Sequence, residues 1–358
     1  MTGFVDGGLP QGPGFPAQIR AAVQRLKTRF DLLDVSAVGM SEYSSRYLTE
    51  ALLREGYQLN VTGHVLFRAL DGLSDELESV TLVDYGGGNG LLSLLAREMG
   101  VGTIVFNDIF EGSCTDARLL AKTMGLEADH YVHGDLDALT SFLAERDLSC
   151  DVVVSYDVIE HIYDVDEHLQ HLPAITSGRL RVVMASAANM LNPRRHRQLM
   201  ATQRLIELQD RQPSAGHKER DALLAYANIR AGLIRAHAPA LSAADVERLT
   251  VATRGLMTGD IEAAVDRFVA DGMLPQPPVH PTNTCDPLTG NWAEHLMDPY
   301  RLAADLSAAG VPCRVEAGYY AFNSGARGVA GAVLNRAVRV TGKLGLRMAP
   351  YYVLVGQR

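Results

Sequence analysis

Three glycines at alternate positions follow one short apolar run and precede another. The first run ends at Val83 and Asp84, and the glycines are Gly86, Gly88 and Gly90. Glycine allows a tight turn and close approach of the backbone to a ligand, and a helix that begins there offers free N–H groups. A dinucleotide loop needs Gly-x-Gly-x-x-Gly, which this spacing lacks. Asp84 would repel a pyrophosphate and suit a cationic ligand that carries an amino group.

A second carboxylate, Asp108, follows the next apolar run and lies 24 residues after Asp84. A carboxylate at the tip of a strand can accept both hydrogen bonds of a ribose diol, and dinucleotide folds place one at a similar offset of about 20 residues. The two acids and the glycine loop therefore predict a site for a positively charged nucleoside.

Strand-like and helix-like stretches alternate from residue 80 to residue 190, which implies βαβ units and a parallel sheet. Ligands of open α/β sheets bind at the carboxyl ends of the strands, so we expect both acids at one edge. A helix at Pro299–Ala309 precedes two later strands that could form a hairpin-like pair. The predicted strands are Val80–Val83, Thr103–Phe106, His130–His133, Val152–Ser155, Leu180–Ala185, Arg314–Tyr320 and Tyr351–Val355.

The glycine loop in this context resembles that of the class I S-adenosylmethionine-dependent methyltransferases, over residues 80–190 and more loosely over 290–358. The run Asp157-Val-Ile-Glu160-His161 looks like the subset that contains ubiquinone-type and related small-molecule enzymes. The resemblance implies a Rossmann-like α/β fold with a seven-stranded, mostly parallel sheet and helices on both faces. It also implies S-adenosyl-L-methionine as the cofactor.

The resemblance assigns cofactor contacts to four strand ends. In the family, an acid after the third strand bonds the adenine amino group and the next apolar residue packs on the ring, and Asp135 and Leu136 match these positions. The cofactor contacts expected on the core are Asp84, Gly86, Gly88, Gly90, Asp108, Ile109, Asp135, Leu136 and Tyr156.

The fourth strand end carries the candidate catalytic residues. A hydroxyl or phenol that attacks the methyl group has to lose a proton, and a positioned base contributes about 10²–10⁴-fold. His161 is the first candidate because the ordinary pKa of histidine lies near neutrality. Glu160 could orient His161, and Asp157 is the rival base. Alternatively, Glu160 only complements a helix dipole and His161 only caps or packs.

Two further segments are candidates near the site. Tyr43, Arg46 and Tyr47 precede the core, where the family often has a helical lid, so they could cover the cofactor and pair with its carboxylate. Trp292 and His295 precede a helix start in a place that faces the acceptor in related enzymes. The alternatives are an ordinary amphipathic helix and a packing tryptophan, since tryptophan is heavily buried on average.

The pattern divides the chain into five parts. We expect a flexible tail, an N-terminal helical cap or lid, the cofactor-binding core, a helical insertion and the C-terminal part of the core, with bounds 1–14, 15–78, 79–193, 194–275 and 276–358. The insertion far exceeds the roughly 2–6 residues usual for loops of α/β units, which favours a lid, a substrate wall or a homodimer interface. Its predicted helices are Arg197–Arg211, His217–His237, Ala243–Leu256 and Asp260–Gly272.

Composition limits the partners. The chain has 358 residues and a net charge of −9, which disfavours nucleic acid because binding there depends on Lys and Arg at phosphates. No apolar run approaches the roughly 18 residues of a membrane span, and no signal peptide precedes the fold, so we expect a cytoplasmic protein without a membrane partner. His280, Cys285 and His295 are spaced too irregularly for a metal site, so none is predicted.

The predicted function is methyl transfer to a small-molecule acceptor, with oxygen of a hydroxyl or phenol favoured. Methylation at carbon or nitrogen is the close alternative, and a non-catalytic nucleoside-binding domain is a further one. A nicotinamide oxidoreductase is disfavoured by the missing last glycine of its loop.

Overall fold

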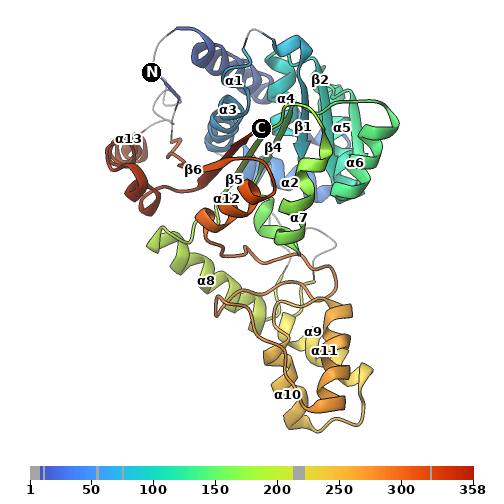
Figure 1. Cartoon of the computed structure of the whole chain (residues 1–358). Helices are drawn as coiled ribbons and strands as arrows, with labels where there is room; N and C mark the ends of the chain where they lie inside the picture. Colours follow the sequence, from blue (N-terminus) through green and yellow to red (C-terminus); the bar gives the residue numbers. More distant parts are fainter. Residues whose placement is uncertain (1–8, 11–12, 54–55, 75, 213–221, 323–324) are drawn as a thin grey trace. The chain divides into compact units, whose positions relative to one another are not determined.

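The computed structural model (Figure 1) divides by its internal contacts into two units, which are described separately. The first comprises residues 1–159, 165–192 and 298–358, and the second comprises residues 160–164 and 193–297. The residues that the structure describes are 9–10, 13–53, 56–74, 76–212, 222–322 and 325–358.

The first unit contains a seven-stranded sheet with the order β3-β2-β1-β4-β5-β7-β6. Neighbours from β3 to β5 are parallel, whereas β7 runs antiparallel to both β5 and β6. The predicted mostly parallel sheet is therefore confirmed, with the last strand of the chain inserted between β5 and β6. The strands are β1 Thr81–Tyr85, β2 Thr103–Asp108, β3 His130–His133, β4 Val152–Tyr156, β5 Arg181–Ser186, β6 Cys313–Ala317 and β7 Tyr352–Gln357.

The order of the sheet reverses between β1 and β4, and this switch point is where open α/β sheets bind ligands. In register, Val83 of β1 pairs with Val105 of β2 on one side and with Val153 of β4 on the other. All three valines are fully buried, as expected for parallel strands that helices cover on both faces.

The helices of the first unit bury one side each against this sheet or against one another. The helix predicted from Pro299 is confirmed, because α12 begins there. Ser41 caps the second helix, because its side chain accepts from the Ser44 N–H. The helices are α1 Phe15–Asp31, α2 Glu42–Tyr47, α3 Tyr57–Leu70, α4 Leu91–Glu98, α5 Glu111–Met124, α6 Leu136–Glu145, α7 Val165–His171, α12 Pro299–Ala308 and α13 Gly325–Val340.

Two details of this unit differ from expectation. The third N-terminal helix, α3, contacts β4 and β5 and is buried around most of its surface, so it forms a layer of the core. The helix α13 was missed, because its glycines, among them Gly328 and Gly331, resemble a loop in the sequence. The predicted tail at 1–14 lies mostly outside the described residues, although Leu9 is buried.

The second unit is helical, as predicted for the insertion. Its helices are α8 Pro193–Leu208, α9 Tyr226–His237, α10 Ala243–Ala252 and α11 Thr258–Asp271. The prediction of a helix from His217 is wrong at least for residues 222–225, because Ala225 N donates to the Asp210 carboxylate and the backbone of Leu223 bonds Arg211. Residues 213–221 lie outside the described part. A small apolar cluster holds the last three helices together: Ile234, Val246, Leu249, Ile261, Val265 and Phe268.

Across the described residues, no helix combines the length and the apolar character needed to cross a bilayer.

Candidate functional site

The glycine loop joins β1 to α4 in a left-handed backbone conformation. Gly86, Gly88 and Gly90 have φ of +68°, +56° and +77°, values that side-chain-bearing residues adopt only at a cost. A Cβ at Gly86 would lie 2.6 Å from Val158, whereas a Cβ at Gly88 would meet nothing within 4 Å. The loop therefore packs tightly at Gly86 and leaves open space at Gly88, where a ligand could approach the backbone.

Asp84 lies beneath this loop with no exposed surface. Its Oδ2 accepts hydrogen bonds from Ser93 N at 3.0 Å and from Ser93 Oγ at 2.7 Å. Its Oδ1 is buried and has no partner among the described residues. Burial is the main reason that the pKa of Asp84 rises to about 6. The hydrogen bonds from Ser93 lower this pKa in part, and the negative charge of the nearby Asp108 raises it. Such a half-satisfied buried carboxylate is costly and is suited to a cationic partner.

Asp108 ends β2 beside the glycine loop and is almost fully buried. Its Oδ2 accepts from Gly88 N at 3.0 Å and its Oδ1 accepts from Phe110 N at 2.8 Å. A carboxylate has about four acceptor positions, so both oxygens keep capacity for a diol. The structure thus brings Asp84, Asp108 and the glycine loop together. The neighbouring Ile109 is 56% exposed.

The third strand end is organised as a helix cap. Asp135 is exposed, and its Oδ1 accepts from Ala138 N at 3.0 Å at the start of α6. Leu136 is buried. Asn107, which the sequence analysis did not single out, ties this end to β2, because its amide donates to the carbonyls of Val132 and Gly134.

Tyr156 and Asp157 stand at the end of β4. Burial raises the pKa of Tyr156 well above its usual value, which keeps the phenol protonated, and its ring meets Tyr351 edge-on at 6.1 Å. Asp157 has φ of +54°, a strained conformation for a residue other than glycine. Its Oδ1 accepts from Ala187 N at 2.7 Å.

The helix α2 is tied to the glycine loop by a residue that the sequence analysis missed. The buried Asn89, between Gly88 and Gly90, donates from its amide to the Ser44 carbonyl at 3.1 Å. This bond holds α2 beside the loop, and with it the predicted lid residues Tyr43, Arg46 and Tyr47. The rings of Tyr43 and Tyr47 stack at 5.8 Å.

Part of the chain matches a known protein family. Residues 83–176, from the middle of β1 to the residue after the helical turn Leu172–Ile175, match the family model of a methyltransferase domain. This part of the chain is a class I S-adenosylmethionine-dependent methyltransferase domain. S-adenosylmethionine is the cofactor of such a domain, and the family resemblance drawn from the sequence is confirmed.

Relatives and solved structures are similar over parts of the chain. A ubiquinone biosynthesis O-methyltransferase of Paramagnetospirillum magneticum is 34% identical over 106 residues, which cover 29% of this chain and 39% of that protein. The chain thus spans about two fifths of the length of this relative. An S-adenosylmethionine-dependent methyltransferase from Mesorhizobium loti is 14% identical, with 83% of this chain and 100% of that chain covered and a TM-score of 0.37. The magnesium protoporphyrin IX methyltransferase of Synechocystis, solved with bound SAH, is 20% identical over 45% of this chain and 66% of its own, with a TM-score of 0.29.

The methyltransferase domain continues into the second unit, which holds the predicted base. His161 Nδ1 lies 2.8 Å from the carbonyl oxygen of Trp292. A carbonyl only accepts, so Nδ1 carries the proton and Nε2 is the basic nitrogen. This bond from the Trp292 carbonyl helps to fix the ring, and the orienting role of Glu160 stays a prediction. Glu160 is fully buried, and its own carbonyl accepts from His295 N at 3.0 Å.

Trp292 and His295 form an aromatic stack with Tyr163. The rings of Trp292 and His295 lie 4.0 Å apart and those of Trp292 and Tyr163 lie 6.4 Å apart, both near parallel. Trp292 is largely buried, and its Nε1 donates to the Tyr163 carbonyl at 3.0 Å. Both the packing role and a role at the acceptor are compatible with this stack.

A buried polar network anchors the loop that carries this stack. Gln203 of α8 donates to Asn283 at 3.0 Å and to the Glu294 carbonyl at 2.7 Å. Asn283 accepts from Leu296 N at 3.0 Å and donates back to its carbonyl at 3.1 Å. In the described residues no group of three His, Cys, Asp or Glu is arranged to hold a metal ion.

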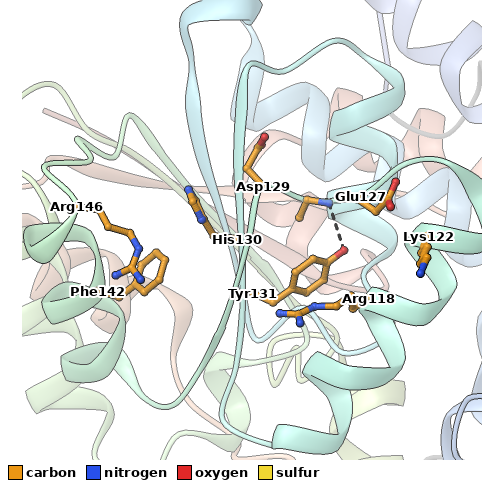
Figure 2. Close-up of a pocket in the computed structure, with 9 residues that line it drawn as sticks. Arg118, Lys122, Glu127, Asp129, His130, Tyr131, Phe142 and Arg146 are labelled. Carbon is orange, nitrogen blue, oxygen red and sulfur yellow. Dashed lines mark hydrogen bonds between the residues drawn. The ribbon is translucent and has the colours of Figure 1, made fainter.

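A pocket of about 470 Å³ lies elsewhere on the methyltransferase domain, at the start of the edge strand β3 (Figure 2). Arg118 lies over the ring of Tyr131 and Arg146 over the ring of Phe142. His130 meets Phe142 edge-on at 5.3 Å. Because this is the amino end of the strand, the pocket is separate from the edge where the glycine loop lies.

Proposed function

We propose that the chain transfers the methyl group of S-adenosylmethionine to an oxygen atom of a small-molecule hydroxyl or phenol. The observation that carries the proposal is the pair of buried carboxylates beside the glycine loop, one of which keeps a buried oxygen without a partner among the described residues. This site fits a nucleoside with a cationic amino-acid tail.

The residues present fit the cofactor in three respects. Asp84 offers an unused acceptor for an ammonium group, Asp108 offers acceptor capacity for a ribose diol, and Gly88 leaves room next to the backbone. When bound, the cofactor supplies an activated methyl group, so the protein contributes binding, orientation and proton handling. Asp135, Leu136 and Ile109 belong to the proposed adenosine end, and Tyr43, Arg46 and Tyr47 to the proposed lid.

His161 is the proposed general base. The Trp292 carbonyl holds its Nδ1 proton, so Nε2 is the atom that accepts the proton of the acceptor hydroxyl. Asp157 is a weaker candidate because its carboxylate already accepts from Ala187 N. Trp292 and His295 are proposed acceptor contacts, since an aromatic stack suits a planar substrate.

The test replaces His161 with glutamine and measures turnover with a panel of phenols, catechols and amines, by release of the demethylated cofactor product. We expect kcat to fall by about 10²–10⁴-fold while cofactor affinity is unchanged. His237→Gln is the matched control, because His237 lies in the same unit and bonds Asp266 instead.

Full activity in H161Q together with a loss in Asp157→Asn would move the base to Asp157. Cofactor binding without turnover on any acceptor class would contradict the proposed methyltransferase activity. The methylated atom follows from nuclear magnetic resonance of a product made with ¹³C-methyl cofactor.

A further inference from the structure

The helix α13 presents an apolar stripe that no described part of the chain covers. Val329, Val333 and Val340 are 69%, 65% and 75% exposed, and their spacing of four and seven residues puts them on one helix face. Leu344, in the turn that follows, is 63% exposed. Single exposed apolar residues are ordinary, but several on one helix face mark a surface that binds something.

The opposite face of α13 fixes the orientation of this stripe. The buried Asn335 accepts from Tyr320 N at 2.8 Å and donates to the Tyr320 carbonyl at 2.8 Å. Gly331 and Val338, four residues before and three residues after Asn335, are buried on the same face. The helix therefore cannot roll to bury its valines without breaking both hydrogen bonds.

Basic residues lie within and beside the stripe, because Arg336 stands three residues after Val333 and four before Val340 and shares their face. Arg336, Arg339, Lys343 and Arg347 are all exposed, and Arg339 lies over the Tyr319 ring at 5.7 Å. No Asp or Glu occurs anywhere from residue 317 to residue 358, although the chain as a whole carries a net charge of −9. The positive charge is thus concentrated on the segment that also exposes the apolar stripe.

We propose that this face of α13 binds the surface of an anionic lipid membrane, with the helix in the plane of the interface. An interfacial helix buries an apolar stripe at the boundary of the headgroups and keeps Lys and Arg beside it. Each basic residue near an anionic surface contributes to binding. The acidic excess elsewhere opposes binding little, because charges more than about 8 Å away are screened at physiological ionic strength.

The combination of exposed valines and basic residues on α13 favours a lipid surface over other partners. A nucleic acid would use the arginines at phosphates but leaves the valines without a role. A protein interface uses aromatic residues at its centre and is depleted of lysine, whereas the stripe consists of aliphatic residues. The sequence led us to expect no membrane partner because no run is long enough to span a bilayer, and an interfacial helix needs no such run.

The test is co-sedimentation of the full chain with vesicles. We expect binding to vesicles of phosphatidylcholine mixed with phosphatidylglycerol, weakening as salt rises, and little binding to phosphatidylcholine alone. The double variant Arg336→Glu/Lys343→Glu should bind about tenfold or more weakly, because each lost basic residue alone is worth about fivefold. Val329→Asp/Val333→Asp should lower binding by a similar factor while circular dichroism shows an unchanged fold.

Matched controls come from α11 in the other unit. Val269 is 62% exposed and Arg267 is exposed, so Val269→Asp and Arg267→Glu make the same chemical changes and should leave binding unchanged. A polarity-sensitive dye on Val333→Cys, in a chain with Cys313→Ser, should shift to the blue with anionic vesicles, whereas the same dye on Val269→Cys should not.

Three results would overturn the proposal: equal binding to neutral and anionic vesicles, undiminished binding of both α13 double variants, or a dye at position 333 that reports no change. A dimer in sedimentation velocity that V329D/V333D dissociates would assign the stripe to a second copy of the chain and would also overturn it. Retention on an RNA column that depends on Arg336 but not on the valines would assign the basic residues to RNA and would also overturn the proposal.

Discussion

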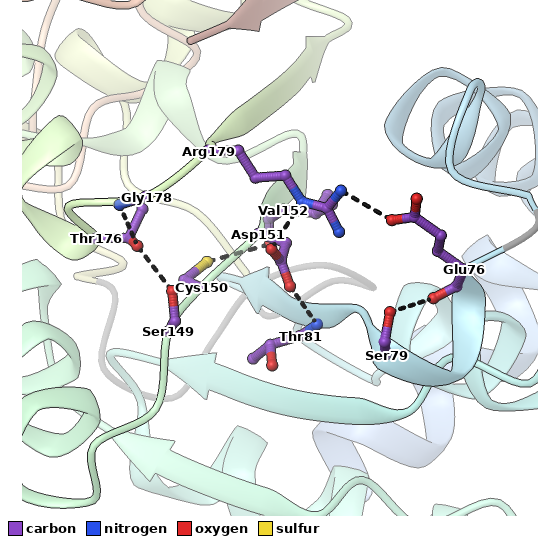
Figure 3. A network of polar contacts seen from close by, with 10 residues as sticks. All are labelled: Glu76, Ser79, Thr81, Ser149, Cys150, Asp151, Val152, Thr176, Gly178 and Arg179. Carbon is purple, nitrogen blue, oxygen red and sulfur yellow. Dashed lines mark hydrogen bonds and ion pairs between the residues drawn. The ribbon is translucent and has the colours of Figure 1, made fainter.

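The carboxylates at the two ends of the parallel strands differ in how fully they are hydrogen-bonded. At the amino ends, Asp151 accepts from Thr81 N at 2.9 Å and from Arg179 at 3.0 Å, and Arg179 also bonds Glu76 at 2.8 Å (Figure 3). At the carboxyl ends, Asp84 keeps a buried oxygen without a partner among the described residues. The amino ends satisfy their polar groups and stabilise the fold, whereas the carboxyl ends retain a costly charge for a ligand.

A second polar cluster at the amino ends is also satisfied, whereas the carboxyl ends carry backbone in an uncommon conformation. At the amino ends, Ser149 and Thr176 bond each other at 3.1 Å and Gly178 N donates to the Thr176 hydroxyl at 3.2 Å (Figure 3). At the carboxyl ends, the glycine loop is left-handed and Asp157 has a positive φ as well. Positive φ is not confined to this side, since Asp147 before β4 has φ of +53°. At the carboxyl ends, however, it accompanies a buried carboxylate oxygen without a partner among the described residues, a combination typical of a functional edge.

The largest expected effect comes from Asp84→Asn. Removing one member of a buried charge pair commonly costs 2–5 kcal/mol, so affinity for S-adenosylmethionine should fall by about a hundredfold in calorimetry. The free protein should become more stable, by about 1–3 kcal/mol in denaturant unfolding at neutral pH, because burial has raised the pKa of Asp84 to about 6 and its ionisation opposes folding.

Asparagine is the appropriate replacement, since it keeps the shape and an oxygen for the bonds from Ser93. Unchanged affinity in D84N would remove Asp84 from the cofactor site. A joint loss of stability and affinity would show that Asp84 is structural, and the distinction between the two strand ends would disappear.

Sequence reasoning found the parts of this edge that are local in the chain. The glycine loop and the acids at strand ends are set by residues within a few positions, so their pattern predicts the strand, the turn and the helix together. Ser93 was missed because only the first turn of α4 carries its hydroxyl over Asp84. The Trp292 carbonyl was missed because it lies 131 residues from His161 and is a backbone group, which no sequence motif records.

The next largest effect is expected at the opposite end. Asp151→Ala leaves the Thr81 N–H and the Nε of Arg179 without this acceptor, and losing a hydrogen bond to a charged group costs about 1.5–3 kcal/mol. We therefore expect a loss of about 2 kcal/mol in the free energy of unfolding with no change in cofactor affinity. A weakened cofactor affinity in the folded variant would show that the two ends are coupled.

The smallest expected effect is that of pH. As pH rises, affinity for the cofactor should increase, whereas the contribution of Asp84 to stability should decrease. The pKa of Asp84 in the folded protein, about 6, lies above the ordinary value of 3.8. The folded state therefore holds an extra proton between these values. The contribution of Asp84 to stability is most favourable below pH 3.8 and is lost as pH rises through 6.

Cofactor binding needs the ionised carboxylate, so affinity should instead rise as pH passes through 6, by about tenfold from pH 5 to pH 7. Calorimetry with S-adenosylmethionine and urea unfolding across this range measure the two trends separately, and D84N should flatten the Asp84 contribution to both. If both trends had the same sign, or if D84N kept the slope of the binding curve, another group would control the charge at this edge. The Asp84 oxygen that has no partner among the described residues would then have to be assigned to the fold, like the satisfied carboxylates at the amino ends.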